Sequence, residues 1–170
     1  HTQQLRVVRV KGKVKFAPNL QPVKFTGTLQ NVTEEVTALN KKEENERNLR
    51  LMILQAPIAI AIMRGPDYVV EIANTKALEL WGRKESETLN VPLFTTIPEL
   101  KSQGIKELLD NVRITGNPFV TDELPVQLNR NGTMETVYIN FSYEPLYDEN
   151  GNINGIMVFG IDITTQVIAR

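Results

Sequence analysis

The chain has 170 residues, of which 41% are apolar and 23% are charged, and its formal net charge is −1. These values suit a globular domain with some additional chain, and the net charge gives no indication of a nucleic-acid or anionic-membrane partner. The absence of cysteine excludes disulfides, thiolate catalysis, iron–sulfur clusters and cysteine-ligated zinc. With His1 as the only histidine, histidine-ligated haem, a histidine metal cluster and a Ser-His-Asp triad are not expected.

The N-terminal part predicts a hairpin followed by a long helix. Strands are expected at residues 5–16 and 22–32, around the turn sequence APNLQP. Thr33 is placed to cap a helix over residues 34–55, a stretch without Pro or Gly whose middle, NKKEENERN, is polar on all sides. Such a helix is either a solvated connector or part of a coiled coil, and its sparse apolar spacing favours the connector.

The middle of the chain predicts two strands and a set of short helices. The apolar run APIAIAIMRG, residues 56–65, indicates a strand covered on both faces, and DYVVEIAN, residues 67–74, indicates a second strand. Asn74 is placed to cap the next helix, which carries Trp81 and ends near Gly82. Residues 104–115 have the apolar spacing of an amphipathic helix. No apolar run approaches the ~20 residues of a membrane span, so we expect a cytoplasmic fragment without membrane contact, whose parent could still be anchored.

The C-terminal part predicts three further strands, at 119–128, 134–146 and 155–163, joined by the Asn131-Gly132 turn and the sequence DENGN. The first and last of the five strands after residue 55 are the ones that read as covered on both faces. We therefore expect them side by side at the centre of a sheet. This predicts an α+β fold with a five-stranded antiparallel sheet in the order 2-1-5-4-3 and helices over one face.

The two ends of the chain carry the same pattern at an offset of 131 positions. Asn31-Val32-Thr33 aligns with Asp162-Ile163-Thr164, and apolar strand positions fall on apolar strand positions back to residues 8 and 139. We interpret residues 5–33 and 137–164 as the same hairpin in two successive domains.

Residues 52–167 resemble the PAS domain family. The stretch ANTKALELWGRKESETL resembles the family's first helix and the turn after it, and NRNG followed by VYINFSYEPLYDENGNINGIMVFGIDIT resembles its C-terminal part, the PAC motif. Residues 5–36 resemble only the last third of such a domain. The expected division is therefore 1–33 for the end of a preceding PAS domain, 34–55 for a connector helix, 56–167 for a complete PAS domain and 168–170 for the start of an output helix.

The resemblance implies a cavity between sheet and helices. The candidate lining residues are Trp81, Leu109, Ile139, Phe141, Tyr143, Ile156 and Val158. The same residues could simply fill a core, and apart from Asn74 only Tyr143 offers a polar group, so a small apolar ligand or none is expected. Flavin linked to cysteine and haem ligated by histidine are disfavoured, and no metal or other cofactor is expected.

The resemblance also implies a role. PAS domains sense or relay signals, frequently as homodimers in sensor histidine kinases, and pass the signal through a closing Asp-Ile-Thr segment into a following helix. Asp162, Ile163 and Thr164 are therefore candidate coupling residues, although Thr164 could serve only as a helix cap. The chain offers no nucleophile–base pair, metal cluster or phosphate loop, so catalysis is expected in a downstream kinase domain of the parent. A diguanylate cyclase or transcription regulator as parent, and a ligand-free adaptor, are the alternatives.

Overall fold

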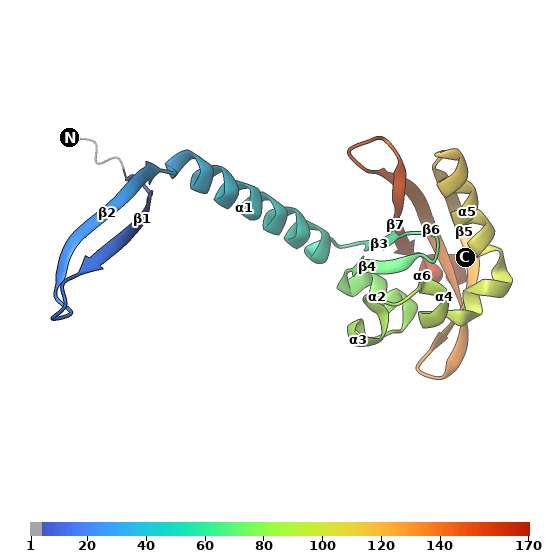
Figure 1. The fold of residues 1–170 in the computed structure, drawn as a ribbon. Coiled ribbons are helices and arrows are strands. Elements are labelled where there is room, and N and C mark those ends of the chain that lie inside the picture. The colour runs from blue at the N-terminus through green and yellow to red at the C-terminus, as the bar shows by residue number, and fades with distance from the viewer. Residues whose placement is uncertain (1–4) are drawn as a thin grey trace. The chain divides into compact units, whose positions relative to one another are not determined.

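The computed structural model describes residues 5–170, which form two units that divide after Arg50. The first unit holds the hairpin strands β1 (Val8–Phe16) and β2 (Pro22–Asn31) and most of helix α1 (Thr33–Gln55) (Figure 1). The elements of the second unit are β3 (Ala59–Arg64), β4 (Val69–Ala73), α2 (Thr75–Trp81), α3 (Glu85–Thr88), α4 (Leu93–Thr96), the 3-10 helix η1 (Pro98–Gln103), α5 (Ile105–Thr115), β5 (Phe119–Arg130), β6 (Thr133–Tyr147), β7 (Ile153–Asp162) and α6 (Thr164–Ile168).

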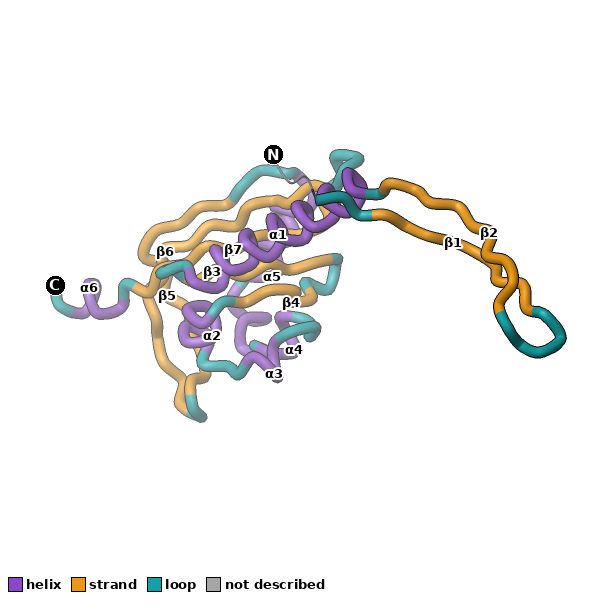
Figure 2. The backbone as a smooth tube through the Cα atoms, turned by 90° about the vertical axis from the view of Figure 1, so that its left-hand side faces the viewer, coloured by secondary structure: helices purple, strands orange, loops and turns teal. Residues whose placement is uncertain are grey.

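The second unit is built on one antiparallel sheet with the strand order β4-β3-β7-β6-β5 (Figure 2). This is the predicted order, and the two strands that read as doubly covered, β3 and β7, are its central neighbours. β3 is buried from Ala59 to Met63. A continuous apolar run without alternation is the pattern expected of such a strand.

Short helices pack against one face of this sheet and close the core (Figure 1). α5 is amphipathic, and its buried side chains are Ile105, Leu109 and Val112. The helix ends at Gly116, whose φ of 72° lies in the left-handed region that favours glycine. The helical layer therefore follows from apolar spacing and from a residue that stops the helix at low cost.

Helix α1 has a different character. It runs for 23 residues and buries none of them. Among residues 5–170, no helix has both the length and the apolar character needed to cross a membrane. Its exposed side chains include Leu39, Leu49 and Met52 as well as the polar middle, and whether it is a solvated connector or part of a coiled coil stays a prediction.

Asn74 is the buried polar residue that joins three elements of the second unit. Its Oδ1 accepts the amide of Ala77 in the first turn of α2, as predicted, and also the amide of Ile60 in β3. Its Nδ2 donates to the carbonyls of Ile53 at 3.1 Å and Ile58 at 2.8 Å. The side chain has no exposed surface. Asn74 therefore caps α2 and also holds the segment that leads into β3 by hydrogen bonds.

The two hairpins have the same backbone arrangement at the offset of 131. Val8 pairs with Asn31 as Ile139 pairs with Asp162, and the register shift after Lys15 recurs after Leu146. The turns also correspond, because the Ala17 amide donates to Gln21 and the Asp148 amide donates to Asn152. The hairpins β1–β2 and β6–β7 therefore share one backbone structure, although their side chains differ.

The double role of Asn74 predicts that Asn74→Asp and Asn74→Ala both destabilise the second unit. The aspartate variant would keep the acceptor for Ala77 but would lose the donor to two carbonyls and bury a charge. Loss of the buried amide contacts should lower the free energy of unfolding by about 2–4 kcal/mol in each variant. Urea unfolding of both variants measures this. If the aspartate variant has wild-type stability, Asn74 acts as a helix cap alone.

Candidate functional site

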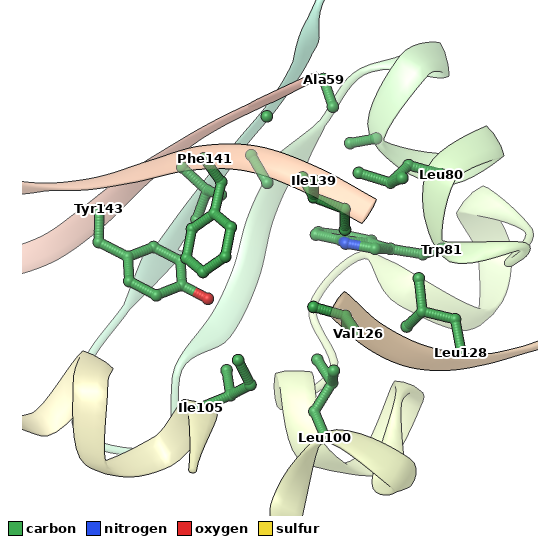
Figure 3. A pocket seen from close by; sticks show the side chains of 14 residues that line it. Ala59, Leu80, Trp81, Leu100, Ile105, Val126, Leu128, Ile139, Phe141 and Tyr143 are labelled. Atoms are coloured by element: carbon green, nitrogen blue, oxygen red, sulfur yellow. The ribbon is translucent and has the colours of Figure 1, made fainter. Parts of the chain in front are cut away.

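A small cavity lies between the sheet and the helical layer of the second unit (Figure 3). Its volume is about 50 Å³, and strands β3, β5, β6 and β7 and helices α2, η1 and α5 contribute to its wall. The lining side chains are apolar or small except for Tyr143 and the indole nitrogen of Trp81. They are Ala59, Ala61, Ala77, Leu80, Trp81, Leu100, Ile105, Val126, Leu128, Ile139, Phe141, Tyr143, Val158 and Gly160.

The structure brings together five of the seven predicted lining residues: Trp81, Ile139, Phe141, Tyr143 and Val158. The other two do not line the cavity. Leu109 and Ile156 are buried in the surrounding core, at 0% and 1% exposure. Periodicity identifies which face of a strand or helix is buried, but it does not tell which buried positions border an empty space.

Small residues create this space, and the three alanines among them are not lining residues predicted from the sequence. Ala59 and Ala61 on β3, Ala77 on α2 and Gly160 on β7 all border the cavity. Two alanines at alternate positions of a central strand place short side chains on one face. That alternation, set against the larger Ile60 and Ile62, is the signal that could have located the cavity wall.

Tyr143 brings a hydroxyl group to the cavity wall. Its ring stacks in a tilted arrangement on Phe141, with the ring centroids 4.9 Å apart. Figure 3 shows its hydroxyl pointing toward the enclosed space. Burial raises the pKa of Tyr143, so the hydroxyl is protonated at neutral pH and can donate a hydrogen bond to a guest.

The cavity does not fit a large cofactor. Sites for drug-sized ligands usually enclose about 300–1,000 Å³, several times the volume found here. No cysteine is available to link a flavin, and the only histidine, His1, lies outside the described residues. Within residues 5–170 no group of three His, Asp or Glu side chains is placed to hold a metal ion. The space suits a molecule of a few atoms.

A largely buried ion pair holds the helical wall beside Trp81. Arg83 pairs with Glu99 at 2.8 Å, and both side chains are at most 15% exposed. Arg83 also donates to the carbonyls of Thr96 and Asn129, and Glu99 accepts the amide of Asn129. These bonds satisfy both charges and fasten the end of α2 and the start of η1 to β5.

The closing segment Asp162-Ile163-Thr164 forms a clasp, by which we mean the bonds between these three residues and Tyr138 of β6. The Thr164 amide and hydroxyl both donate to Asp162 Oδ1, at 2.9 and 2.5 Å. The Thr164 hydroxyl in turn accepts the amide of Tyr138 at 2.9 Å, and the Ile163 amide donates to the Tyr138 carbonyl. Thr164 therefore completes the β6–β7 ladder. It makes no side-chain cap for α6, which corrects that prediction.

The first hairpin ends in the same clasp. The Thr33 amide and hydroxyl donate to Asn31 Oδ1, and the Thr33 hydroxyl accepts the amide of Val7 at 2.8 Å. The predicted capping role of Thr33 is corrected in the same way, because its hydroxyl is bonded to the backbone of Val7, in the segment that enters β1. Asn31 and Asp162 can both accept the threonine bonds because each offers a side-chain oxygen, but the carboxylate of Asp162 also pairs with Arg130.

Arg130 connects the cavity wall to the clasp. Its Nε donates to the carbonyl of Leu80 at 2.8 Å, and its Nη2 lies 3.2 Å from Asp162 Oδ2. Gly82 permits the close approach, because a Cβ there would lie 2.8 Å from Arg130 Cγ, and its φ of 64° also suits the end of α2. One guanidinium thus touches a helix that lines the cavity and the residue that starts the clasp.

Asp162 is held in its charged form by these contacts. Burial by itself would raise the pKa of Asp162, but the hydrogen bonds from Thr164 and Arg130 outweigh it and hold the pKa below its usual range. The clasp is therefore intact at neutral pH. Sequence reasoning identified Asp162 but not Arg130, which comes from a strand 32 residues away.

The cavity predicts opposite effects for two glycines on β7. A methyl group at Gly160 would enter the cavity at ordinary distances of 3.7 Å from Ile139 and Leu80, so Gly160→Ala should stabilise the fold by about 0.5–1 kcal/mol. A methyl group at Gly155 would lie 2.7 Å from the carbonyl oxygen of Met63, so Gly155→Ala should destabilise it. Urea unfolding compares the two. A clearly destabilised Gly160→Ala variant would contradict the cavity geometry.

Comparison with known proteins agrees with this architecture. A family model described as PAS fold matches residues 54–168. The PAS domain of BvgS from Bordetella pertussis has a TM-score of 0.58 at 20% identity, and the match covers 74% of this chain and 93% of that one. A PAS domain from Colwellia psychrerythraea has a TM-score of 0.57 at 13% identity, over 70% of this chain and 97% of that one.

The N-terminal elements also have a counterpart. The structure of an RNA-binding Light-Oxygen-Voltage receptor matches 96% of this chain, with a TM-score of 0.57 and 15% identity, and this match spans 40% of that receptor. At such identities the structural likeness concerns the fold. The family model, however, matches more than half of the chain and coincides with the five-stranded sheet, its helices and the clasp. The chain therefore belongs to the PAS fold family.

Proposed function

We propose that this chain is a sensory and signal-relay module that passes the state of its cavity to the segment after β7. The observation that carries this proposal is the position of Arg130 between the Leu80 carbonyl and the Asp162 carboxylate. A shift of α2 upon ligand binding changes the distance from Leu80 to Arg130. Because one guanidinium serves both partners, it then holds Asp162 differently.

The clasp converts that change into a change at the end of the sheet. Asp162 orients the Thr164 hydroxyl, and this hydroxyl accepts the last ladder amide, that of Tyr138. When Arg130 no longer holds Asp162, the bonds that fix the last residue of β7 and the first residue of α6 are weakened. A ligand can shift this equilibrium only if it binds one of the two arrangements more tightly.

The proposed ligand is a small apolar molecule, held against the alanine and glycine wall, with the Tyr143 hydroxyl available as a hydrogen-bond donor. The small volume supports a second candidate function, a ligand-free adaptor whose cavity takes up no guest. Native mass spectrometry of protein purified without refolding distinguishes the two. A bound small molecule supports the sensor, whereas a bare chain that also fails to take up xenon supports the adaptor.

The proposed parent is a cytoplasmic or membrane-anchored sensor histidine kinase that works as a homodimer, with a diguanylate cyclase or transcription regulator as the alternative. In this proposal residues 5–33 are the last hairpin of a preceding PAS domain. The shared register and shared clasp of the two hairpins support that assignment. The exposed apolar side chains of β1 and β2, such as Val10 and Phe25, then belong to the core of that domain.

The relay predicts that Arg130→Gln uncouples the cavity from the clasp. In the wild-type chain, xenon in the cavity should shift the amide NMR signals of Ile139 and of Thr164. In the variant only the signal near the cavity should move, because the connection to Asp162 is lost. Arg64→Gln, which removes an exposed arginine paired with Glu71, is the matched control. An undiminished Thr164 response in Arg130→Gln would show that the relay takes another route.

The lowered pKa of Asp162 predicts an acid-dependent contribution to stability. Its folded-state pKa lies below the unfolded value of about 3.9, so the contribution is complete above that value and is lost as the pH falls through the folded pKa. The stability difference between wild type and Asp162→Asn should therefore narrow between about pH 6 and about pH 3. Urea unfolding at each pH measures it. A difference that stays constant would mean that the Asp162 charge does not hold the clasp.

A further inference from the structure

The net charge of −1 conceals a strong separation of charge along the chain. All twenty acidic residues lie from position 34 onward, whereas residues 5–33 contain six basic residues and no acidic ones. The hairpin segment thus carries a formal charge of +6, and the remainder carries −7. The hairpin is a strongly basic element in an otherwise acidic chain.

Strand alternation gathers these charges on one face of the hairpin. Along β1 the even positions are apolar or Gly12, and the odd positions are Arg9, Lys11, Lys13 and Lys15. Their partners on β2 are Gln30, Thr28, Thr26 and Lys24. Every residue of both strands is exposed. We call this surface, made of Arg9, Lys11, Lys13, Lys15 and Lys24, the basic face.

The fold itself does not require the basic face. β6–β7 builds the same register with Asn140, Ser142, Glu144 and Leu146 at the positions of the four β1 cations. The cations also oppose hairpin formation, because Lys15 lies directly opposite Lys24 and like charges in that position destabilise a sheet. A feature that the fold does not need, and that costs stability, points to a partner that compensates it.

We infer that the basic face is a docking surface for an acidic helix of a partner protein. Alternate residues of β1 are spaced by about 6.8 Å, and a helix presents residues i and i+4 about 6 Å apart, so a stripe of carboxylates can meet Lys11, Lys13 and Lys15 in succession. Helices commonly pack on the faces of sheets. Salt bridges at this exposed surface mainly govern orientation and the rate of association.

The composition of the face disfavours other anionic partners. Single-stranded nucleic acid is usually held by aromatic stacking, and the basic face has no aromatic side chain. Stable anchoring to a bilayer takes an apolar or lipid group in addition to a basic patch, but here the apolar side chains, including Phe16 and Phe25, are on the opposite face.

The test uses the 170-residue chain and a fluorescent, alanine-rich peptide of roughly 20 residues with glutamates at i, i+4 spacing. Binding should be measurable at about 50 mM salt and should weaken steeply by about 300 mM. Lys11→Glu/Lys13→Glu should weaken binding by about 10-fold or more, since two attractions become repulsions. The matched control is Lys41→Glu/Lys42→Glu, which makes the same charge change on α1 and should bind like the wild type.

Further arms of the experiment decide between the outcomes. A disulfide between Val10→Cys and Leu29→Cys, a cross-strand pair on the apolar face, locks the hairpin so that unfolding cannot explain a lack of binding. A peptide of the same composition with scattered glutamates should bind more weakly. The inference is overturned if the locked chain does not bind the striped peptide, if both charge reversals act alike, or if an RNA oligonucleotide or phosphatidylserine vesicles bind more tightly than the peptide.

Discussion

A strand that ends at the rim of a sheet leaves its neighbour's last amide without a backbone partner, and the clasp solves this problem twice in one chain. A threonine hydroxyl takes the place of the missing carbonyl, and an Asn or Asp oxygen two residues earlier holds that hydroxyl in position. The clasp fixes where each hairpin stops and where the next helix begins.

The core of the second unit combines hydrogen-bonded polar anchors with a small, mostly apolar cavity. Asn74 fastens the entry to β3, and the Arg83–Glu99 pair fastens the helical wall, with each of these groups hydrogen-bonded. Between the anchors, alanine and glycine residues leave the cavity unfilled. Arg130 differs from these anchors because it divides one guanidinium between a cavity wall and an exposed carboxylate. A partly exposed, shared contact is easier to rearrange than a buried one.

Comparing the two hairpins shows which features the hairpin structure requires and which can vary. Register, bulge, turn and clasp recur at both ends of the chain, so these features are set by backbone bonding and by a few turn and clasp residues. The outward faces share almost nothing, being cationic in one hairpin and mostly uncharged in the other. The surface chemistry of each hairpin is therefore free to serve a different partner on the same scaffold.

The sequence by itself determined the order of the elements, the sheet order and the repeat, because these depend on local periodicity, on turn residues and on the continuous apolar runs of β3 and β7. It also located Asn74 as a cap and Asp162 as a site of interest. Only the tertiary structure decided that Thr33 and Thr164 complete strands instead of capping helices, that Leu109 and Ile156 lie away from the cavity, and that Arg130 reaches Asp162. Each of these depends on which distant segments meet, and a hydroxyl or a guanidinium has several possible partners until the packed neighbours select one.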